Sequence, residues 1–479
     1  MNVRHCEERP LPQPLSTWRG GEVPSSMKRR EVKAPSPVER AGGEVVSYLL
    51  FCLLFILSSC LREEENLFPE SAALRLNHAI ENTKKTLISP KHNNGWIMEY
   101  FPTNNQEGYT FLMKFDNNSF ATIAAKNKYT PVYTTDKGAF DVIGDNGPVL
   151  TFNTYNKVFH LFSDPKDPLG SSSLNGIGLG GDYEFVIMDV TNDLITLKGK
   201  KRGTHVLMRP VKQGQDWQGY FDLLDKMDVS LFNLKLPVTF TLKNKHGDDP
   251  YYLTNGSTHI FTAKTQSQID AKEQGENIPF IITDYGLRFA QPFIIGTDTV
   301  QAFRLGDDKS KLVCMDENVH AEITGEELSS LFLNSYSALW AFELSALSDR
   351  VASIYNRIVN SCISVYQAES VTVGIGYSGT RRTHELRLVF VRNAGRQTLT
   401  GNLSMTATAS GSPNGISFQA TGTGDNNGNT FSNTIDGFKE MAGLLSKSFV
   451  LSSDILLNPV NMKFMQAGGT EVWFQTACQ

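Results

Sequence analysis

Residues 183–198 read YEFVIMDVTNDLITLK, and this stretch predicts the fold. It contains two apolar runs, Tyr183–Val190 and Leu194–Lys198, joined by the turn-forming residues Thr191-Asn192-Asp193. β-branched and aromatic residues favour strands, and such a short connection joins antiparallel neighbours. The stretch therefore predicts an antiparallel hairpin.

Similar short runs recur on both sides of this hairpin, and turns rich in Asn, Asp and Gly separate them. They include Trp96–Phe101, Tyr109–Phe115, Phe120–Lys126, Val149–Tyr155, Val158–Phe162 and Thr204–Arg209. Eight or more strands joined in this way favour a closed or strongly curled antiparallel sheet.

Helical spacing of apolar residues appears in a few segments. Ser71 is the expected N-cap of a helix that ends before Ser89-Pro90, and Trp217–Met227 predicts a second helix. The broadest apolar stripe runs along Leu333–Cys362, and a short helix is expected at Phe438–Leu445. The predicted class is α+β, mainly antiparallel β.

The chain has 479 residues, too many for one compact domain. We expect an N-terminal domain over 71–315, made of a helix and a curled or barrel-like sheet. A charged linker is expected over 316–332, and a second domain of helix plus β over 333–479. Residues 1–59 are interpreted as a signal peptide with an upstream extension, with translation starting later, at Met27.

The segment VVSYLLFCLLFILSSC, Val45–Cys60, predicts where the protein resides. Its apolar part is shorter than the ~20 residues that cross a bilayer, so it fits the h-region of a signal peptide. Leu57-Ser58-Ser59-Cys60 resembles a bacterial lipobox, in which the cysteine thiol receives diacylglycerol. Cys60 is thus the predicted lipidation site, and a buried helix ending in a chance cysteine is the alternative.

Residues 60–70 are expected to form a lipidated acidic linker. Glu63-Glu64-Glu65 follows Cys60 and resembles the surface-export signal of Bacteroidota lipoproteins, although a solvated linker has the same composition. The formal net charge of the chain is −5. An acidic body argues against a nucleic-acid partner, which would favour a basic surface.

The order of several short motifs carries a resemblance to a known family. The motifs are the lipobox, FPESAALRL (68–76), Gly95-Trp96, Pro148–Phe152, His160 with Ser163-Asp164-Pro165, Gly181–Phe185, Leu197–Lys201 and Tyr285–Phe289. Over about 60–310 the chain resembles the Bacteroidota lipoprotein family catalogued as domain of unknown function 4302. The resemblance implies an accessory lipoprotein of outer-membrane uptake systems, and it supplies no catalytic residue.

Several sequences resemble chemical motifs without their context. Gly176–Gly181 and Gly374–Gly379 fit G-x-G-x-x-G, but no strand-then-helix surrounds them, so we interpret both as turns. His160 with Asp164, and Asp182 with Glu184 on one strand face, are weighed as acid–base pairs against a solvated face, which we favour.

The remaining candidates also have simpler interpretations. Asp116–Asn118 and Asp425–Asn429 lack the spacing of a calcium loop and are expected to be turns. The aromatic residues Trp96, Tyr100, Trp217, Trp340 and Trp473 would stack on sugars if exposed, but are expected in the core. The cysteines after Cys60 have no zinc-ligand spacing and are expected to be buried. No metal ligand, cofactor or catalytic residue is predicted.

These observations give three hypotheses. The first is a non-catalytic binding or accessory lipoprotein on the outer face of the outer membrane, anchored through Cys60, that captures a glycan or peptide for an outer-membrane transporter complex. The second is a hydrolase of glycans or peptides, which would need paired carboxylates in a cleft. The third is a structural scaffold of a transporter complex, which a large exposed apolar patch would favour.

Overall fold

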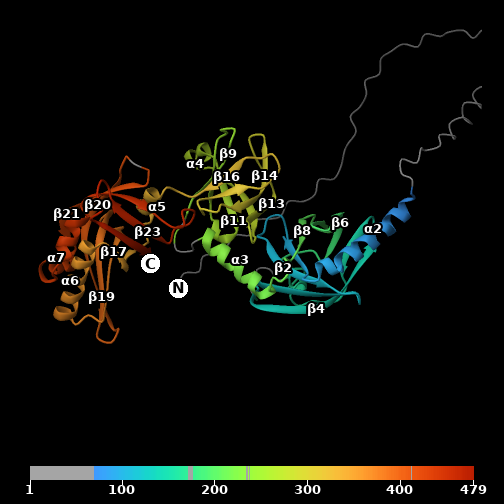
Figure 1. The fold of residues 1–479 in the computed structure, drawn as a ribbon, viewed down its shortest axis with the longest axis horizontal. Helices are drawn as coiled ribbons and strands as arrows, with labels where there is room; N and C mark the ends of the chain where they lie inside the picture. Colours follow the sequence, from blue (N-terminus) through green and yellow to red (C-terminus); the bar gives the residue numbers. More distant parts are fainter. Residues whose placement is uncertain (1–69, 171–175, 233–235, 237, 412) are drawn as a thin grey trace, which may run out of the picture. The chain divides into compact units, whose positions relative to one another are not determined.

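The computed structural model describes residues 70–170, 176–232, 236, 238–411 and 413–479. The lipobox, the acidic linker and the signal segment lie outside these residues. Residues 70–479 form one compact unit. Within it the chain builds three closed antiparallel barrels, each of eight strands, which are coloured blue to green, green to yellow and orange to red in Figure 1. The predicted class, α+β and mainly antiparallel β, is confirmed.

The first barrel contains strands whose neighbours in the sheet follow each other in the sequence. They are β1 (Trp96–Tyr100), β2 (Tyr109–Phe115), β3 (Phe120–Asn127), β4 (Thr130–Gly144), β5 (Pro148–Phe152), β6 (Glu184–Val190), β7 (Ile195–Gly199) and β8 (His205–Pro210). β8 closes the sheet on β1, with Trp96 opposite Pro210. The hairpin expected from the opening stretch is β6–β7. The prediction of a strand over Val158–Phe162 is wrong, because this segment contains a 3-10 helix, His160–Phe162.

Two helices cover the first barrel. α2 (Ala72–Leu87) packs on β4, β5 and β6, and Ser71 caps it, because its Oγ accepts from the Leu74 N–H. α3 (Trp217–Leu231) places Tyr220 and Phe221 against the outward side chains of β1, β2 and β3. Both helices were predicted, and α3 continues past the predicted end at Met227.

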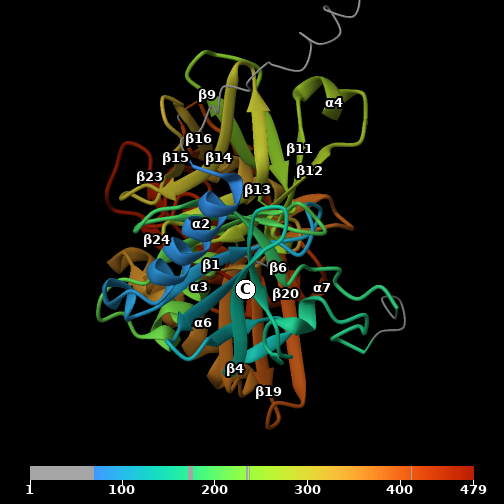
Figure 2. The same ribbon diagram turned by 90° about the vertical axis from the view of Figure 1, so that its right-hand side faces the viewer.

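The second barrel closes β16 on β9, with Ala321 opposite Asn244. Its strands are β9 (Phe240–Asn244), β10 (Tyr251–Thr254), β11 (Ile260–Lys264), β12 (Glu276–Ile282), β13 (Gly286–Ile295), β14 (Asp298–Leu305), β15 (Lys311–Cys314) and β16 (Ala321–Thr324). Figure 2 shows α4 (Gln266–Asp270) beside β11 and β12. The prediction of a linker over 316–332 is wrong. This segment contains strand β16, which pairs with β9 and closes the second barrel.

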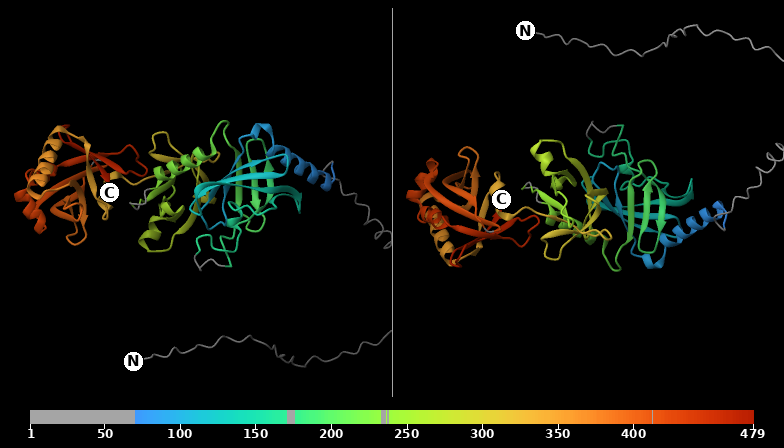
Figure 3. Two further views of the ribbon diagram at one scale, coloured as in Figure 1. Left: turned by 90° about the horizontal axis from the view of Figure 1, so that it is seen from below. Right: turned by 90° about the horizontal axis from the view of Figure 1, so that it is seen from above.

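The third barrel closes β24 on β17, with Trp340 opposite Cys478. Its strands are β17 (Trp340–Leu347), β18 (Ser370–Ser378), β19 (Thr383–Arg392), β20 (Gln397–Ala409), β21 (Gly415–Gly424), β22 (Ser448–Ser452), β23 (Asn461–Gln466) and β24 (Trp473–Cys478). Its helices are α5 (Leu328–Asn334), α6 (Asp349–Tyr366), α7 (Asn426–Thr434) and α8 (Phe438–Leu445). Figure 3 shows α6 in orange against the strands of this barrel.

The prediction of one long helix over Leu333–Cys362 is also wrong. The first two residues of this segment end helix α5, Trp340–Leu347 is strand β17, and the long helix begins only at Asp349 after the N-cap Ser348. Phe342 pairs with Thr476 of β24, so the backbone hydrogen bonds of this segment go to a strand far along the chain. The short helix expected at Phe438–Leu445 is confirmed.

The barrel interiors are packed with aromatic rings rather than open. In the first barrel Tyr100 contacts Phe111, Phe159, Phe162 and Phe185 at ring-centroid separations of 5.5–6.1 Å. Edge-to-face contacts of this kind add to the burial of the rings. The apolar cores of the second and third barrels are continuous, and Leu328, Leu331 and Phe332 of α5 belong to that shared core.

Candidate functional site

A groove of about 740 Å³ lies where the first barrel, α3 and the second barrel meet. This volume is in the range of small-molecule sites. The first barrel contributes residues from the start of β2 and the β3–β4 turn, α3 contributes Leu224 to Val229, and the second barrel contributes the turn before β11. Val229 is 68% exposed and supplies an apolar wall that solvent reaches.

His259 of the second barrel joins the groove's three parts. The residue has a φ of 55°, a left-handed conformation that follows the 3-10 turn Gly256–Thr258. Its Nδ1 lies 3.0 Å from Glu107 Oε2 of the first barrel, and its Nε2 lies 2.9 Å from Asp228 Oδ1 of α3. Two carboxylates can only accept, so both ring nitrogens donate and the ring is an imidazolium.

The electrostatics of the groove keep this arrangement charged. Burial alone would lower the pKa of His259, but hydrogen bonds to Asp228 and Glu107 raise it to about 9. Burial alone would raise the pKa of Glu107, but hydrogen bonds from His259 and Lys128 lower it to about 2. Glu107 Oε1 also accepts from the Tyr109 hydroxyl at 3.0 Å, so both carboxylate oxygens are engaged.

A second ion cluster connects β3 to α3. Lys126 Nζ donates to Asp222 Oδ1 at 3.0 Å and to Asp225 Oδ2 at 2.6 Å, and both carboxylates raise the pKa of the lysine. The i, i+3 spacing of the two aspartates puts them on one face of α3. Each charged side chain that lines the groove therefore has an ion-pair partner.

The pKa shifts decide what chemistry the groove suits. A general acid or base works best with a pKa near the operating pH. The pKa of His259 moves upward and that of Glu107 moves downward, so neither exchanges a proton readily near pH 7. The groove is thus built to present fixed charges, hydroxyl groups and apolar walls to a ligand.

A buried ion network joins the first two barrels. Glu99 of β1 is 1% exposed and accepts from Arg288 Nε of β13 at 2.5 Å and from Arg209 Nε of β8 at 3.0 Å. Arg209 also donates to Asp284 Oδ1 at 2.6 Å. Gly108 adds a main-chain bond across the same junction, from its N–H to the Phe280 carbonyl at 3.0 Å. These contacts fix the groove's walls.

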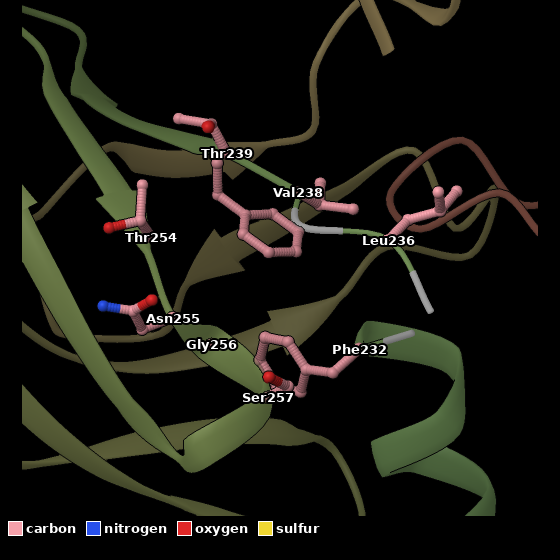
Figure 4. A pocket seen from close by; sticks show the side chains of 9 residues that line it. Phe232, Leu236, Val238, Thr239, Thr254, Asn255, Gly256 and Ser257 are labelled. Atoms are coloured by element: carbon pink, nitrogen blue, oxygen red, sulfur yellow. The ribbon is translucent and has the colours of Figure 1, made fainter. Parts of the chain in front are cut away.

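A smaller pocket lies beside the groove and shares Phe232 and Ser257 with it. Figure 4 shows Thr254 and Asn255 on one side of this pocket and Leu236 on the other. Its volume is about 130 Å³, below the usual range of ligand sites, and among the residues that the structure describes no charged side chain lines it. The larger groove is therefore the candidate site.

The structure does not pair the residues that the sequence offered as acid–base pairs, His160 with Asp164 and Asp182 with Glu184. The His160 ring bonds to main-chain groups, and Asp164 Oδ1 accepts from the Lys166 N–H. Asp182 lies before β6 and accepts from the Arg202 N–H, whereas Glu184 begins the strand and pairs with Lys200. The prediction that Asp182 and Glu184 share a strand face is therefore wrong.

The other sequence candidates fall into structural roles. Trp96, Tyr100 and Trp340 are at most 1% exposed, so the core interpretation is confirmed for them. Trp217 donates to the Asn94 carbonyl, and Lys463 covers Trp473. The turn interpretation is confirmed for Gly178, which lies in a turn with a φ of 59°. It is wrong for Gly374–Gly379, because this segment up to Ser378 belongs to strand β18.

The two Asp/Asn clusters differ from each other. Asp116 accepts from the N–H groups of Asn118 and Phe120, which confirms the first cluster as a turn. The turn predicted over Asp425–Asn429 is wrong, because this segment starts helix α7. Asp425 caps the helix and accepts from the Gly428 N–H at 2.6 Å. The described part of the chain contains no group of three or more His, Cys, Asp or Glu side chains that could hold a metal ion.

The predicted lipidation site, Cys60, lies outside the described residues. Cys362 and Cys478 are buried and Cys314 is half-buried, as expected for cysteines that pack as small apolar residues. None of the helices among the described residues is long and apolar enough to span a bilayer.

Glu107, Asp228 and His259 were not identified from the sequence. They are separated by up to 152 residues, and each is an isolated polar residue in its own segment. The turn-forming pair Asn255-Gly256 places His259 near a turn, but nothing local indicates its two partners.

Comparison with protein families matches residues 64–307 to "Domain of unknown function (DUF4302)". The chain belongs to this family. The matched residues of this DUF4302 member include the first barrel, α3 and most of the second barrel, and with them every residue of the candidate groove. Among curated proteins, none matches the chain.

Two solved structures align with most of this DUF4302 member at low similarity. One is a putative DNA polymerase III beta subunit from Eubacterium rectale ATCC 33656, with 10% identity, a TM-score of 0.13, and coverage of 82% of this chain and 95% of that one. The other is the beta clamp of Helicobacter pylori in complex with 3,4-difluorobenzamide, with 9% identity, a TM-score of 0.13, and coverage of 84% and 98%. At such TM-scores the likeness carries no argument about fold or function.

Proposed function

We propose that this protein is a lipid-anchored, non-catalytic binding or accessory component of an outer-membrane nutrient uptake system of Bacteroidota. Its groove between the first barrel, α3 and the second barrel takes a glycan or peptide. The anchor is supported by the apolar run Val45–Leu57 that ends in the lipobox cysteine Cys60. The acidic run Glu63–Glu65 behind it supports exposure at the cell surface.

The observation that carries the binding role is the state of the groove's charges. A cavity of about 740 Å³ is lined by ionisable groups that are already paired with one another. Paired charges do not need a ligand of a particular net charge, and they leave hydroxyl groups and apolar walls for recognition. Neutral or zwitterionic ligands such as glycans and short peptides fit that surface.

The hydrolase hypothesis is less well supported by the same residues. Hydrolysis of a glycosidic or peptide bond would need a group in the groove that gains and loses a proton near neutral pH. The shifts of His259 and Glu107 run away from that range.

The anchor is tested by palmitate labelling and by protease treatment of intact cells that carry wild type or Cys60→Ala. We expect the label to be lost in Cys60→Ala and the wild type to be cleaved on intact cells. Label that persists in the variant contradicts the anchor. Label that depends on Cys60 without cleavage contradicts surface exposure and indicates a periplasmic orientation.

The groove is tested by a substitution that fills it. Val229→Trp places a large ring on an exposed position of α3, so folding should be preserved. Val365→Trp is the matched control, because Val365 is 55% exposed on α6 of the third barrel. Glycan and peptide libraries should bind wild type and the control but not Val229→Trp. Binding that is equal in all three proteins contradicts the groove as the site, and product release from a bound ligand contradicts a non-catalytic role.

A further inference from the structure

Three aromatic rings follow one another at the rim of the first barrel. Tyr155 comes shortly after β5, His160 begins the 3-10 helix, and Tyr183 directly precedes β6. The ring centroids of Tyr155 and His160 are 5.6 Å apart with an interplanar angle of 33°. Those of His160 and Tyr183 are 5.4 Å apart at 35°. The set of these three rings is called the rim aromatics below.

The outer two rings are open to solvent. Tyr155 is 64% exposed and Tyr183 is 44% exposed, and both are large side chains that usually bury most of their surface. None of the three residues lines the groove. The rim aromatics are therefore a separate surface of the first barrel.

The central ring is held rigidly by main-chain groups. The Asn156 N–H donates to His160 Nδ1 at 3.0 Å, so Nε2 carries the hydrogen and donates to the Phe152 carbonyl at 3.2 Å. Burial lowers the pKa of His160, although both main-chain bonds oppose the shift. A ring that accepts at Nδ1 and donates at Nε2 is neutral, and these two main-chain contacts fix its orientation.

The rim aromatics rest on the aromatic core of the barrel. The His160 ring contacts Phe159, which is 1% exposed and packs against Phe152 at 4.9 Å. The Tyr183 carbonyl accepts from the Phe152 N–H, which ties the rim to β5. The central His160 ring is therefore already in place for a ligand, so little of its side-chain entropy would be lost on binding.

The angles between the rings indicate the shape of the ligand. Aromatic cages that surround a quaternary ammonium group need rings that face it from several directions. Tilts of 33° and 35° between neighbouring rings are closer to parallel than to the perpendicular walls of such a cage, so these rings suit a flat ligand better. The face of an aromatic ring carries negative partial charge and attracts the C–H bonds on the face of a sugar ring.

The charge of this region favours a neutral ligand. The central ring is uncharged, and Asp182 and Glu184 stand on either side of Tyr183 in the sequence. Lys200 pairs with Glu184, and Asp182 is buried and accepts from the Arg202 N–H, so neither carboxylate presents an unpaired charge to a ligand.

We propose that Tyr155, His160 and Tyr183 form a second binding site, which stacks against the hexopyranose rings of a neutral glycan. The residues of this site are not among those that line the groove. It would hold a polysaccharide on the first barrel whether the groove takes a glycan or a peptide.

The test is affinity electrophoresis of the full chain in gels that contain soluble neutral glucan, mannan or galactan. Titration calorimetry with oligosaccharides of whichever polymer retards the protein then measures affinity. Tyr155→Ala and Tyr183→Ala should each weaken binding by roughly three- to tenfold, the loss of one aromatic contact. Tyr155→Phe keeps the ring and should bind like wild type. Tyr336→Ala is the matched control, because Tyr336 is 58% exposed in the third barrel.

The outcomes separate this site from the groove. Weaker retardation of Tyr155→Ala and Tyr183→Ala, with wild-type retardation of Tyr336→Ala and of the groove-filling Val229→Trp, supports the rim aromatics. Loss in Val229→Trp with retention in Tyr155→Ala and Tyr183→Ala overturns the second site and leaves the groove as the glycan site. Absence of retardation of wild type by all three polysaccharides also overturns it, and leaves the groove's peptide ligands to be tested.

Discussion

Replacing His259 by asparagine removes the imidazolium that joins Glu107 of the first barrel to Asp228 of α3. Asparagine tolerates the left-handed backbone of this position, where φ is 55°, so the substitution should not strain the turn. Its shorter side chain does not replace both hydrogen bonds. We therefore expect the variant to lose stability in a way that depends on pH.

The size and direction of this effect come from the pKa of His259, which folding raises from 6.5 to about 9. At 1.36 kcal/mol per pKa unit, the shift corresponds to about 3 kcal/mol of stabilisation. A group whose pKa rises on folding gives its full contribution below the unfolded pKa. It loses the contribution as the pH rises through the folded pKa. The stabilisation should thus be complete below pH 6.5 and absent well above about 9.

The assay is urea unfolding of wild type and His259→Asn at a pH below 6.5, at one between 6.5 and 9, and at one above 9. The difference between the two proteins should decrease by about 3 kcal/mol across this series. Hydrogen exchange of the Gly108 amide, which bonds across the two barrels, reports whether this junction opens first.

His205→Asn is the control, because His205 is exposed on β8, away from the groove. It should follow wild type at every pH. A destabilisation of His259→Asn that is the same at every pH would refute the reasoning, because it would show that the imidazolium charge contributes nothing and that only packing was lost.

Three further changes test other contacts. Glu99→Gln should destabilise the chain by about 3–5 kcal/mol in urea unfolding, because the buried guanidinium of Arg288 would lose its counter-charge; a cost near zero would contradict the role of this network. Gly108→Ala should cost about 1–3 kcal/mol and speed exchange of amides at the junction, because a Cβ there would lie 2.5 Å from the Cβ of Ile281; unchanged stability would show that the barrels can move apart. Ser71→Ala should cost ~1 kcal/mol and speed hydrogen exchange in the first turn of α2, since its hydroxyl caps that helix; unchanged exchange would show that packing alone holds the helix end.

Local patterns predicted many of the elements well. Ser71 caps α2 as expected, and Tyr109–Phe115 and Phe438–Leu445 are a strand and a helix at their predicted bounds. In these segments the side-chain period, the turn residues and the caps all favour the same local structure. The same agreement gave the antiparallel hairpin β6–β7.

The helix expected over Leu333–Cys362 failed because a tertiary contact overrode the pattern. The apolar spacing of the helix is broken between Phe342 and Leu347, and Ser348 is a good N-cap, so a later start was visible in the sequence. The strand that precedes it needs β24 as a partner, with Phe342 opposite Thr476, and no local signal in the sequence indicates that pairing.

The number of barrels was also beyond the sequence pattern. Alternating runs predict strands and antiparallel order, but they do not show where a sheet closes on itself. Closure depends on which distant strand supplies the hydrogen bonds of the first one: β8 for β1, and β16 for β9. The residues 316–332 were interpreted as a linker because they are charged, yet β16 completes the second barrel there.

The sequence by itself determined the class of fold, the secondary structure of strongly patterned segments and the features that predict a lipid anchor at Cys60. The fold class and the patterned segments depend on interactions between residues that are close in the sequence. The lipid anchor is predicted from the apolar run before Cys60. Only the tertiary structure decided the three closed barrels and the groove. Glu107, Asp228 and His259 become one charged cluster because folding brings together residues 31 and 152 positions apart, and because burial makes their mutual attraction strong enough to shift their pKa values.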